Sequence, residues 1–319
     1  MKKGKFSKFT VKRISSSPYF SSDFSKLEQE TIINLTAADM LPLNSPELTS
    51  ILITNTHTDV SSITQEQLEI CQLMIHPNSG YDNFPSNFIS KVNFPVVIGN
   101  PIRANAVASF ILSALLSHYS PIPNEATWSE SRKWPRKLLA ELNILILGHG
   151  HIGRLLSESL APLARVVRIY DPYAGFPDLD LQNIDVLIPA CSLNKKNQHL
   201  IDEAMLLKLN EDFLLINAAR GSLVNTKDLL SVLLKRPSAF AVLDVFEKEP
   251  ADFNQLFKET KNIKFSSHIA GVYKKIDINT ANFEAQVISD FIKLDVIEFE
   301  IKYKTMLLKN RLLSPDFLI

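Results

Sequence analysis

Short apolar runs alternate with amphipathic stretches along the second half of the chain. From about residue 143, each run has three to five mostly apolar positions and is followed by polar residues. Runs of this length are typical of strands buried on both faces of a parallel sheet. The pattern predicts six strands, at residues 144–147, 166–170, 184–188, 213–216, 240–243 and 263–265.

The stretches between these runs have helical spacing. Apolar residues at 152, 155, 156 and 160 share one helical face, and the apolar stretch 229–234 is ended by Pro237. Strands that alternate with helices in this way predict an α/β fold, a Rossmann-type doubly wound domain around a parallel sheet.

The first hundred residues repeat the alternation with weaker signals. The candidate strands are residues 9–13, 31–35, 51–54, 73–76 and 96–98. They predict a smaller, flavodoxin-like α/β domain. Residues 104–119 are expected to form a long helix leading into the second domain, and residues 281–294 an amphipathic helix that returns to the first.

Composition narrows the classes of function. The 319 residues carry 34 Lys+Arg and 34 Asp+Glu, so their net charge of zero gives no electrostatic footprint for nucleic acid or an acidic membrane. No apolar run approaches the ~18–20 residues of a membrane span, and the basic start lacks the apolar region of a secretory signal. Cys71 and Cys191 are too few for a disulfide framework or a cysteine zinc site. We expect a soluble, cytoplasmic protein.

Three of the nine glycines fall within six residues. Gly148, Gly150 and Gly153 form a G-x-G-x-x-G motif between a predicted strand and a predicted helix. In a dinucleotide site the first glycine allows a tight turn, the second lets the backbone approach the pyrophosphate, and the third lets the helix pack closely. The motif in this context predicts a dinucleotide-binding loop.

The residues around the loop complete this interpretation. The helix start at His151 and Ile152 would offer N–H groups to the phosphates. Asp171, at the end of the next strand, would bind the ribose hydroxyls and repel a 2′-phosphate, which favours NAD as the cofactor. The alternative is a glycine turn without a ligand. His149 and His151 lack a third ligand nearby, so no metal is expected.

Three polar segments follow later strands and carry a second set of candidates. Segments 217–221, 243–250 and 267–271 would converge at the carboxyl edge of the sheet. They contain Arg220, which can bind a carboxylate, and His268, which can act as a general acid near neutral pH. A carboxylate, at Glu247 or Glu249, can hold the imidazole. Each residue alone has a structural alternative at the surface or in a loop.

In these motifs the chain resembles the D-isomer-specific 2-hydroxyacid dehydrogenase family. The matching segments, in order across roughly residues 50–295, are Gly80-Tyr81-Asp82-Asn83, the glycine loop with Tyr170-Asp171-Pro172, Asn217–Gly221, Asp244–Pro250 and His268–Gly271. The resemblance implies an oxidoreductase that transfers a hydride between NAD(H) and a small 2-oxo acid or D-2-hydroxy acid.

The resemblance also implies individual roles. Arg220 would bind the substrate carboxylate and carbonyl, Glu249 rather than Glu247 would assist the histidine, and His268 would donate the proton. The other implied binding residues are Ala218, Asp244 and Gly271 for the cofactor, and the backbone of Asn78, Ser79 and Gly80 for the substrate carboxylate.

Domain limits and assembly follow from the same resemblance. It implies a substrate domain split between residues 1–99 and 273–319, an NAD-binding domain at residues 100–272, and a homodimer formed through the latter. Departures from the family pattern at residues 78–79, 109 and 190–193 leave the substrate open, as does Arg103, which could face a second negative charge or lie exposed. The alternatives are an NAD(H)-sensing, corepressor-like protein and a related enzyme on sugar-acid phosphates.

Overall fold

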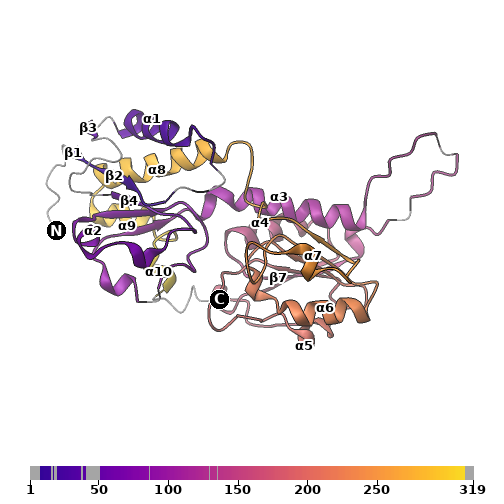
Figure 1. The fold of residues 1–319 in the computed structure, drawn as a ribbon. Helices are drawn as coiled ribbons and strands as arrows, with labels where there is room; N and C mark the ends of the chain where they lie inside the picture. Colours follow the sequence, from indigo (N-terminus) through magenta and orange to yellow (C-terminus); the bar gives the residue numbers. More distant parts are fainter. Residues whose placement is uncertain are drawn as a thin grey trace. The chain divides into compact units, whose positions relative to one another are not determined.

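The chain divides into two compact units. The computed structural model describes residues 8–15, 17, 20–36, 39–40, 51–85, 87–128, 130–134 and 136–312. Unit 1 comprises Met1–Arg103 and Val272–Leu318, and unit 2 is built on Ala104–Gly271 (Figure 1). The first unit is therefore made from two separate stretches of sequence.

Unit 2 contains a six-stranded parallel sheet. Its strands are β7 (Asn143–Leu147), β8 (Val166–Tyr170), β9 (Val186–Pro189), β10 (Leu214–Asn217), β11 (Phe240–Leu243) and β12 (Ile263–Phe265). They lie in the order β12-β11-β10-β9-β7-β8, and every neighbouring pair is parallel. Strands β8 and β9 lie on opposite sides of β7, so the strand order reverses there. The carboxyl ends of the strands beside β7 therefore form a topological switch point. The predicted Rossmann-type fold is confirmed.

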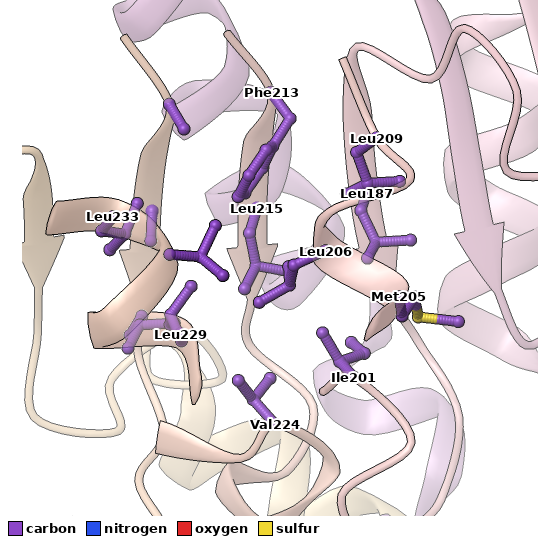
Figure 2. Close-up of a cluster of buried hydrophobic side chains, with 14 of the residues drawn as sticks. Leu187, Ile201, Met205, Leu206, Leu209, Phe213, Leu215, Val224, Leu229 and Leu233 are labelled. Atoms are coloured by element: carbon purple, nitrogen blue, oxygen red, sulfur yellow. The ribbon is translucent and has the colours of Figure 1, made fainter. Parts of the chain in front are cut away.

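Helices cover both faces of this sheet. They are α3 (Asn100–Tyr119), which begins in unit 1, η3 (Leu139–Glu141), α4 (His151–Leu160), η4 (Pro172–Ala174), α5 (Glu203–Leu206), η5 (Gly221–Leu223), α6 (Thr226–Lys235) and α7 (Phe253–Leu256). Alternate strand residues explain the two faces: Ile144 and Ile146 pack with α3 and α4. Leu145 and Leu147 belong to the opposite core with α5 and α6, part of which Figure 2 shows.

Unit 1 contains a four-stranded sheet and a two-stranded sheet, both parallel. Its strands are β1 (Lys8–Phe9), β2 (Val11–Arg13), β3 (Asp39–Met40), β4 (Ile51–Ile53), β5 (Leu73–His76) and β6 (Val96–Ile98). The order is β2-β4-β5-β6, and β1, separated from β2 only by Thr10, pairs with β3. All of these pairs are parallel. When β1 and β2 are counted together as the first strand, β3 is the second and the spatial order is 2-1-3-4-5. This is the order of a flavodoxin-like sheet, as predicted.

The helices of unit 1 come from both stretches of sequence. They are α1 (Phe24–Thr36), η1 (Val60–Ser62), α2 (Gln65–Ile70), η2 (Ile89–Lys91), α8 (Ile276–Lys293), α9 (Val296–Lys302) and α10 (Lys309–Leu312). Helices α1 and α8 run side by side (Figure 1). Arg13 of β2 forms 2.6 Å ion pairs with Glu28 of α1 and Glu284 of α8, so one guanidinium ties three elements together.

The predicted strand at residues 31–35 is wrong, because this segment lies within α1. Phe24, Glu28 and Ile32 are buried at i, i+4 and i+8, whereas Ile33 and Leu35 are 43% and 38% exposed. This burial follows the period of a helix and not the alternation of a strand. In the described part of the chain, no helix has both the length and the apolar character needed to cross a membrane.

Candidate functional site

The glycine loop connects β7 to α4, and its three glycines meet different surroundings. Gly148 has a φ of +106°, and a Cβ there would lie 2.8 Å from the Cys191 nitrogen. A Cβ on Gly153 would overlap the Gly148 carbonyl oxygen, whereas one on Gly150 would meet nothing within 4 Å. Folding therefore requires two of these glycines. The third leaves open space where α4 starts.

The start of α4 is suited to an anion. Gly150 is its N-cap residue and provides no side-chain hydrogen bond to the first turn, which begins at His151 and Ile152. The N-terminal N–H groups of a helix attract negative charge, and open space beside Gly150 lets a ligand approach the backbone. These residues fit the pyrophosphate of a dinucleotide.

Asp171 follows β8 and is only 6% exposed. Its Oδ1 accepts hydrogen bonds from the backbone N–H groups of Tyr173 (3.1 Å) and Ala174 (3.0 Å). Its Oδ2 accepts one from His149 N–H at 2.7 Å. The carboxylate thus holds the glycine loop against the turn after β8. Because Oδ2 can accept a second bond, a ribose hydroxyl can bind there without breaking this arrangement.

The surroundings of the loop histidine His149 are aromatic and polar. His149 contacts the edge of Phe176, and its Nε2 lies 3.5 Å from Ser157 Oγ. Burial first, and then the charge of Arg154, lower the pKa of His149. Within the described ranges, no group of three or more His, Cys, Asp or Glu side chains is arranged to hold a metal ion.

The turn after β10 carries Arg220. Buried Asn217 shapes this turn, since its Nδ2 donates to Arg220 O (2.9 Å) and its Oδ1 accepts from Ala219 N–H (3.0 Å). Arg220 Nη1 donates to Ala219 O at 2.8 Å, and Ala218 is buried. Asn217 was not predicted as a site residue, although it opens the motif that contains Arg220.

Glu249 and His268 are brought together. His268 Nδ1 lies 2.8 Å from Glu249 Oε2, and Phe246 N–H donates to Glu249 Oε1 at 3.0 Å. Burial raises the pKa of the Glu249 carboxyl. The hydrogen bonds from His268 and Phe246, together with the charge of Arg220, outweigh burial and hold this pKa below its ordinary value. Arg220, Glu249 and His268 therefore interact within unit 2.

Asp244 fixes the loop that carries His268. This fully buried carboxylate accepts hydrogen bonds from Ser266 Oγ (2.5 Å), Ile269 N–H (2.8 Å) and Ala270 N–H (2.8 Å). His268 itself has a φ of +55°, which is uncommon for a residue other than glycine, and its N–H donates to Asp244 O. Gly271 ends this loop and unit 2.

Glu247 has a different partner from Glu249. Its Oε2 lies 2.7 Å from His199 Nε2, and its Oε1 accepts a hydrogen bond from Thr226 N–H at 2.8 Å. Each glutamate of this turn is thus paired with its own histidine. Sequence reasoning weighed both glutamates against His268 alone and missed His199, which lies about 70 positions upstream.

In unit 1, buried His76 organises the loop formed by Asn78, Ser79 and Gly80. Its Nε2 lies 2.8 Å from Gly80 O, and its Nδ1 lies 3.0 Å from Thr54 Oγ1. Because a carbonyl only accepts, Nε2 carries the hydrogen. Asn78 N–H already donates to His76 O at 2.7 Å. His76 was not predicted as part of the site.

Comparison with known proteins gives one family. Residues 112–270 match the family model described as "D-isomer specific 2-hydroxyacid dehydrogenase, NAD binding domain". A curated relative, the glyoxylate reductase of Thermococcus gammatolerans, is 28% identical over 214 residues, which are 60% of this chain. The chain spans 64% of that relative's length.

Solved structures share the fold over nearly the whole chain. A 3-phosphoglycerate dehydrogenase of Entamoeba histolytica with bound NAD⁺ matches with a TM-score of 0.69 and 16% identity, covering 92% of this chain and 98% of that one. A D-lactate dehydrogenase of Aquifex aeolicus in complex with NAD and lactic acid matches with a TM-score of 0.69 and 17% identity, covering 94% and 98%. At these identities the likeness concerns the fold alone.

Proposed function

We propose, from the premise that the chain belongs to the D-isomer specific 2-hydroxyacid dehydrogenase family, that it transfers a hydride between NAD(H) and a small 2-oxo acid or D-2-hydroxy acid. The observation that carries this proposal is the His268–Glu249 pair, 2.8 Å apart, with the charge of Arg220 acting on Glu249. An imidazole, a carboxylate and a guanidinium in one unit are the groups that reduction of a 2-oxo acid requires.

The chain's own residues provide for the cofactor. Gly148, Gly150 and Gly153 with the start of α4 would hold the pyrophosphate, and Asp171 the adenosine ribose. Asp244 and the backbone around Ala218 would lie at the nicotinamide carboxamide, and Gly271 would also contact the cofactor. NADH, when bound, supplies the hydride.

His268 would act as the acid in the reductive direction. Since its Nδ1 faces Glu249 Oε2, the Nδ1 hydrogen is donated to that carboxylate, and Nε2 is the atom that gives a proton to the substrate oxygen. Glu249 stays ionised over the neutral range because its pKa is lowered, so it can stabilise the imidazolium. In the oxidative direction Nε2 takes the proton back.

Arg220 would bind the substrate carboxylate and carbonyl through its planar guanidinium. We assign further contacts with the carboxylate to the backbone of Asn78, Ser79 and Gly80. The Asn78 N–H already donates to His76 O. The chemical identity of the rest of the substrate stays open.

A panel of 2-oxo acids with NADH, followed by NADH absorbance, tests the proposal. We expect turnover with at least one acid and a loss of about 10²–10⁴-fold in Arg220→Ala and His268→Ala. Arg168→Ala is the matched control, because this half-buried arginine pairs with Asp180 and lies on edge strand β8, three strands from β10, which precedes Arg220. Near-full activity in either site variant would refute the assigned roles. Tight NADH binding without turnover on any acid would favour the NAD(H)-sensing alternative.

The proposal extends to a homodimer formed through unit 2. Residues 120–128 and 130–134 leave the body of the unit beyond the end of α3 (Figure 1). This arm exposes Ile122 (88%) and Trp128 (78%), apolar side chains of the kind that interfaces bury. Light scattering of the chain and of Trp128→Ser tests it, and a monomer at micromolar concentration would contradict it.

A cytoplasmic location is supported by the two free thiols, Cys71 and Cys191.

A further inference from the structure

Two glutamates lie two positions apart on the turn after β11 and serve different histidines. Glu249 Oε2 lies 2.8 Å from His268 Nδ1. Glu247 Oε2 lies 2.7 Å from His199 Nε2. The mechanism proposed above uses the first pair and leaves the second unexplained.

The Glu247 carboxylate joins segments that are far apart in sequence. Besides His199, it binds the backbone N–H of Thr226, the first residue of α6, at 2.8 Å. A carboxylate at the start of a helix is favoured by the helix dipole, and a bond from a backbone N–H to a charged acceptor is stronger than one to a neutral acceptor. This bond distinguishes Glu247 from an ordinary surface ion pair.

The segment of His199 is itself fastened to the turn that follows Arg220. His199 N–H donates to Ser222 O at 2.8 Å, and Ile201 N–H donates to Leu223 O at 2.9 Å. On the other side, a Cβ on Gly221 would overlap the backbone of Phe246, so the Arg220 turn and the glutamate turn touch without intervening space. The Glu247–His199 pair therefore links the turn that carries Glu249 to the segment bonded to the turn after Arg220.

We propose that Glu247 and His199 are positioning residues that hold the glutamate turn so that Glu249 reaches His268. The inference rests on the proposed function, because it names what this second pair does for the same site. It also gives the two glutamates separate tasks: Glu249 contacts the acid–base histidine, and Glu247 anchors the backbone that presents Glu249.

Loss of the anchor has a measurable consequence at Glu249. The groups that act on its carboxyl are His268, the Phe246 N–H and Arg220, all of which favour the ionised form. If the turn is released, these contacts lengthen and the pKa of Glu249 rises toward its ordinary value. A substitution that only weakened the fold would not move this pKa.

The test compares Glu247→Ala, His199→Asn and Glu247→Gln in the full chain. Asparagine is chosen at position 199 because it tolerates the φ of +56° found there. We expect Glu247→Ala and His199→Asn to lower kcat about tenfold and to move the acid limb of the kcat/KM profile to higher pH, with little change in KM for NADH. Glu247→Gln keeps an acceptor for Thr226 N–H and is expected to recover most of the loss.

Two further measurements separate this inference from the proposed function. The ¹³C shift of the Glu249 carboxyl, assigned with Glu249→Gln, reports its titration without any turnover. Lys235→Met is the control, since it removes another exposed ion pair of the same unit, Lys235–Glu203 at 2.7 Å, and should change neither readout. If the Glu249 carboxyl has the same pKa in Glu247→Ala as in the parent chain, the inference is wrong even if kcat falls. If the parent chain reduces no 2-oxo acid, the proposed function fails and the titration still decides the inference.

Discussion

The two units bury carboxylates in opposite ways. In unit 2, Asp171 and Asp244 accept hydrogen bonds mostly from backbone N–H groups of the loops at strand ends. In unit 1, Glu28 and Glu284 meet the guanidinium of Arg13 between α1 and α8, among side chains alone. Backbone donors fix the path of a loop, whereas the ion cluster fixes how a strand and two helices pack.

The electrostatic cost differs as well. Burial raises the pKa of Glu284 to about 8, and the nearby charge of Glu28 acts in the same direction. The single guanidinium of Arg13 faces both side chains and opposes this shift only in part. Asp244 is fully buried too, but three donors converge on its two oxygens. Buried carboxylates therefore fix the loops of unit 2, whereas in unit 1 they make the stability of the core depend on pH.

The largest expected effect comes from removing the cation of the cluster. Arg13→Met leaves the buried Glu28 carboxylate and the buried Glu284 carboxyl without their common partner, which should cost about 3–5 kcal/mol of unfolding free energy in urea titrations. Arg168→Met is the matched control, because its partner Asp180 is half exposed, and it should cost less than about 1 kcal/mol. Equal losses in the two variants would mean that the buried cluster is no more important than a surface pair.

Next in size is the loss of a loop-fixing carboxylate. Asp244→Ala leaves the N–H groups of Ile269 and Ala270 without an acceptor, so we expect about 1–3 kcal/mol of destabilisation and a fall in kcat of about 10²-fold as His268 loses its position. Ser266→Ala removes only one of the three donors and should have a much smaller effect on kcat. If both variants keep full kcat, Asp244 does not position His268.

A smaller effect is expected at the other loop carboxylate. Asp171→Ala removes the acceptor for His149 N–H and the proposed ribose contact, so the Kd of NADH should rise about tenfold by fluorescence titration. The preference for NADH over NADPH should fall, because a negative charge beside a 2′-phosphate is lost. Asp180→Ala, at a half-exposed position, is the control, and an unchanged Kd in Asp171→Ala would contradict the assignment.

The buried cluster of unit 1 also makes stability depend on pH. The pKa of Glu284 is raised from 4.5 to about 8, so the native chain keeps a proton that the unfolded chain releases between these values. Stability should therefore fall as pH rises from about 4.5 to about 8. Glu284→Gln should flatten this slope and stabilise the chain at pH 9, measured as unfolding free energy against pH. A slope like that of the parent chain would mean that Glu284 is ionised in the native state.

Sequence predicted the sheets because parallel strands are short apolar runs. The same reasoning failed at residues 31–35, where Ile32, Ile33 and Leu35 resemble a strand but only Ile32 is buried in α1. The run of apolar residues is visible in the sequence. The face that becomes buried depends on α8, which comes from about 250 positions further along the chain.

For the site, the sequence supplied residue types and the structure supplied partners. Arg220, Glu249 and His268 stand in recognisable motifs at strand ends, so they could be named as candidates. The pairing of Glu247 with His199 depends on the positive φ of His199 and on the start of α6, which no motif encodes. The bonds of His76 to Gly80 and Thr54 likewise depend on how β4 and β5 pair.

Gly150 separates the needs of folding from those of binding. Its backbone is extended, with a φ of −73°, a conformation open to any residue, and nothing in the protein occupies the space where its side chain would be. A library of substitutions at this position, selected only for a folded protein, should therefore accept many residues. The same library selected for dinucleotide capture should return glycine, whereas positions 148 and 153 should return glycine under both selections.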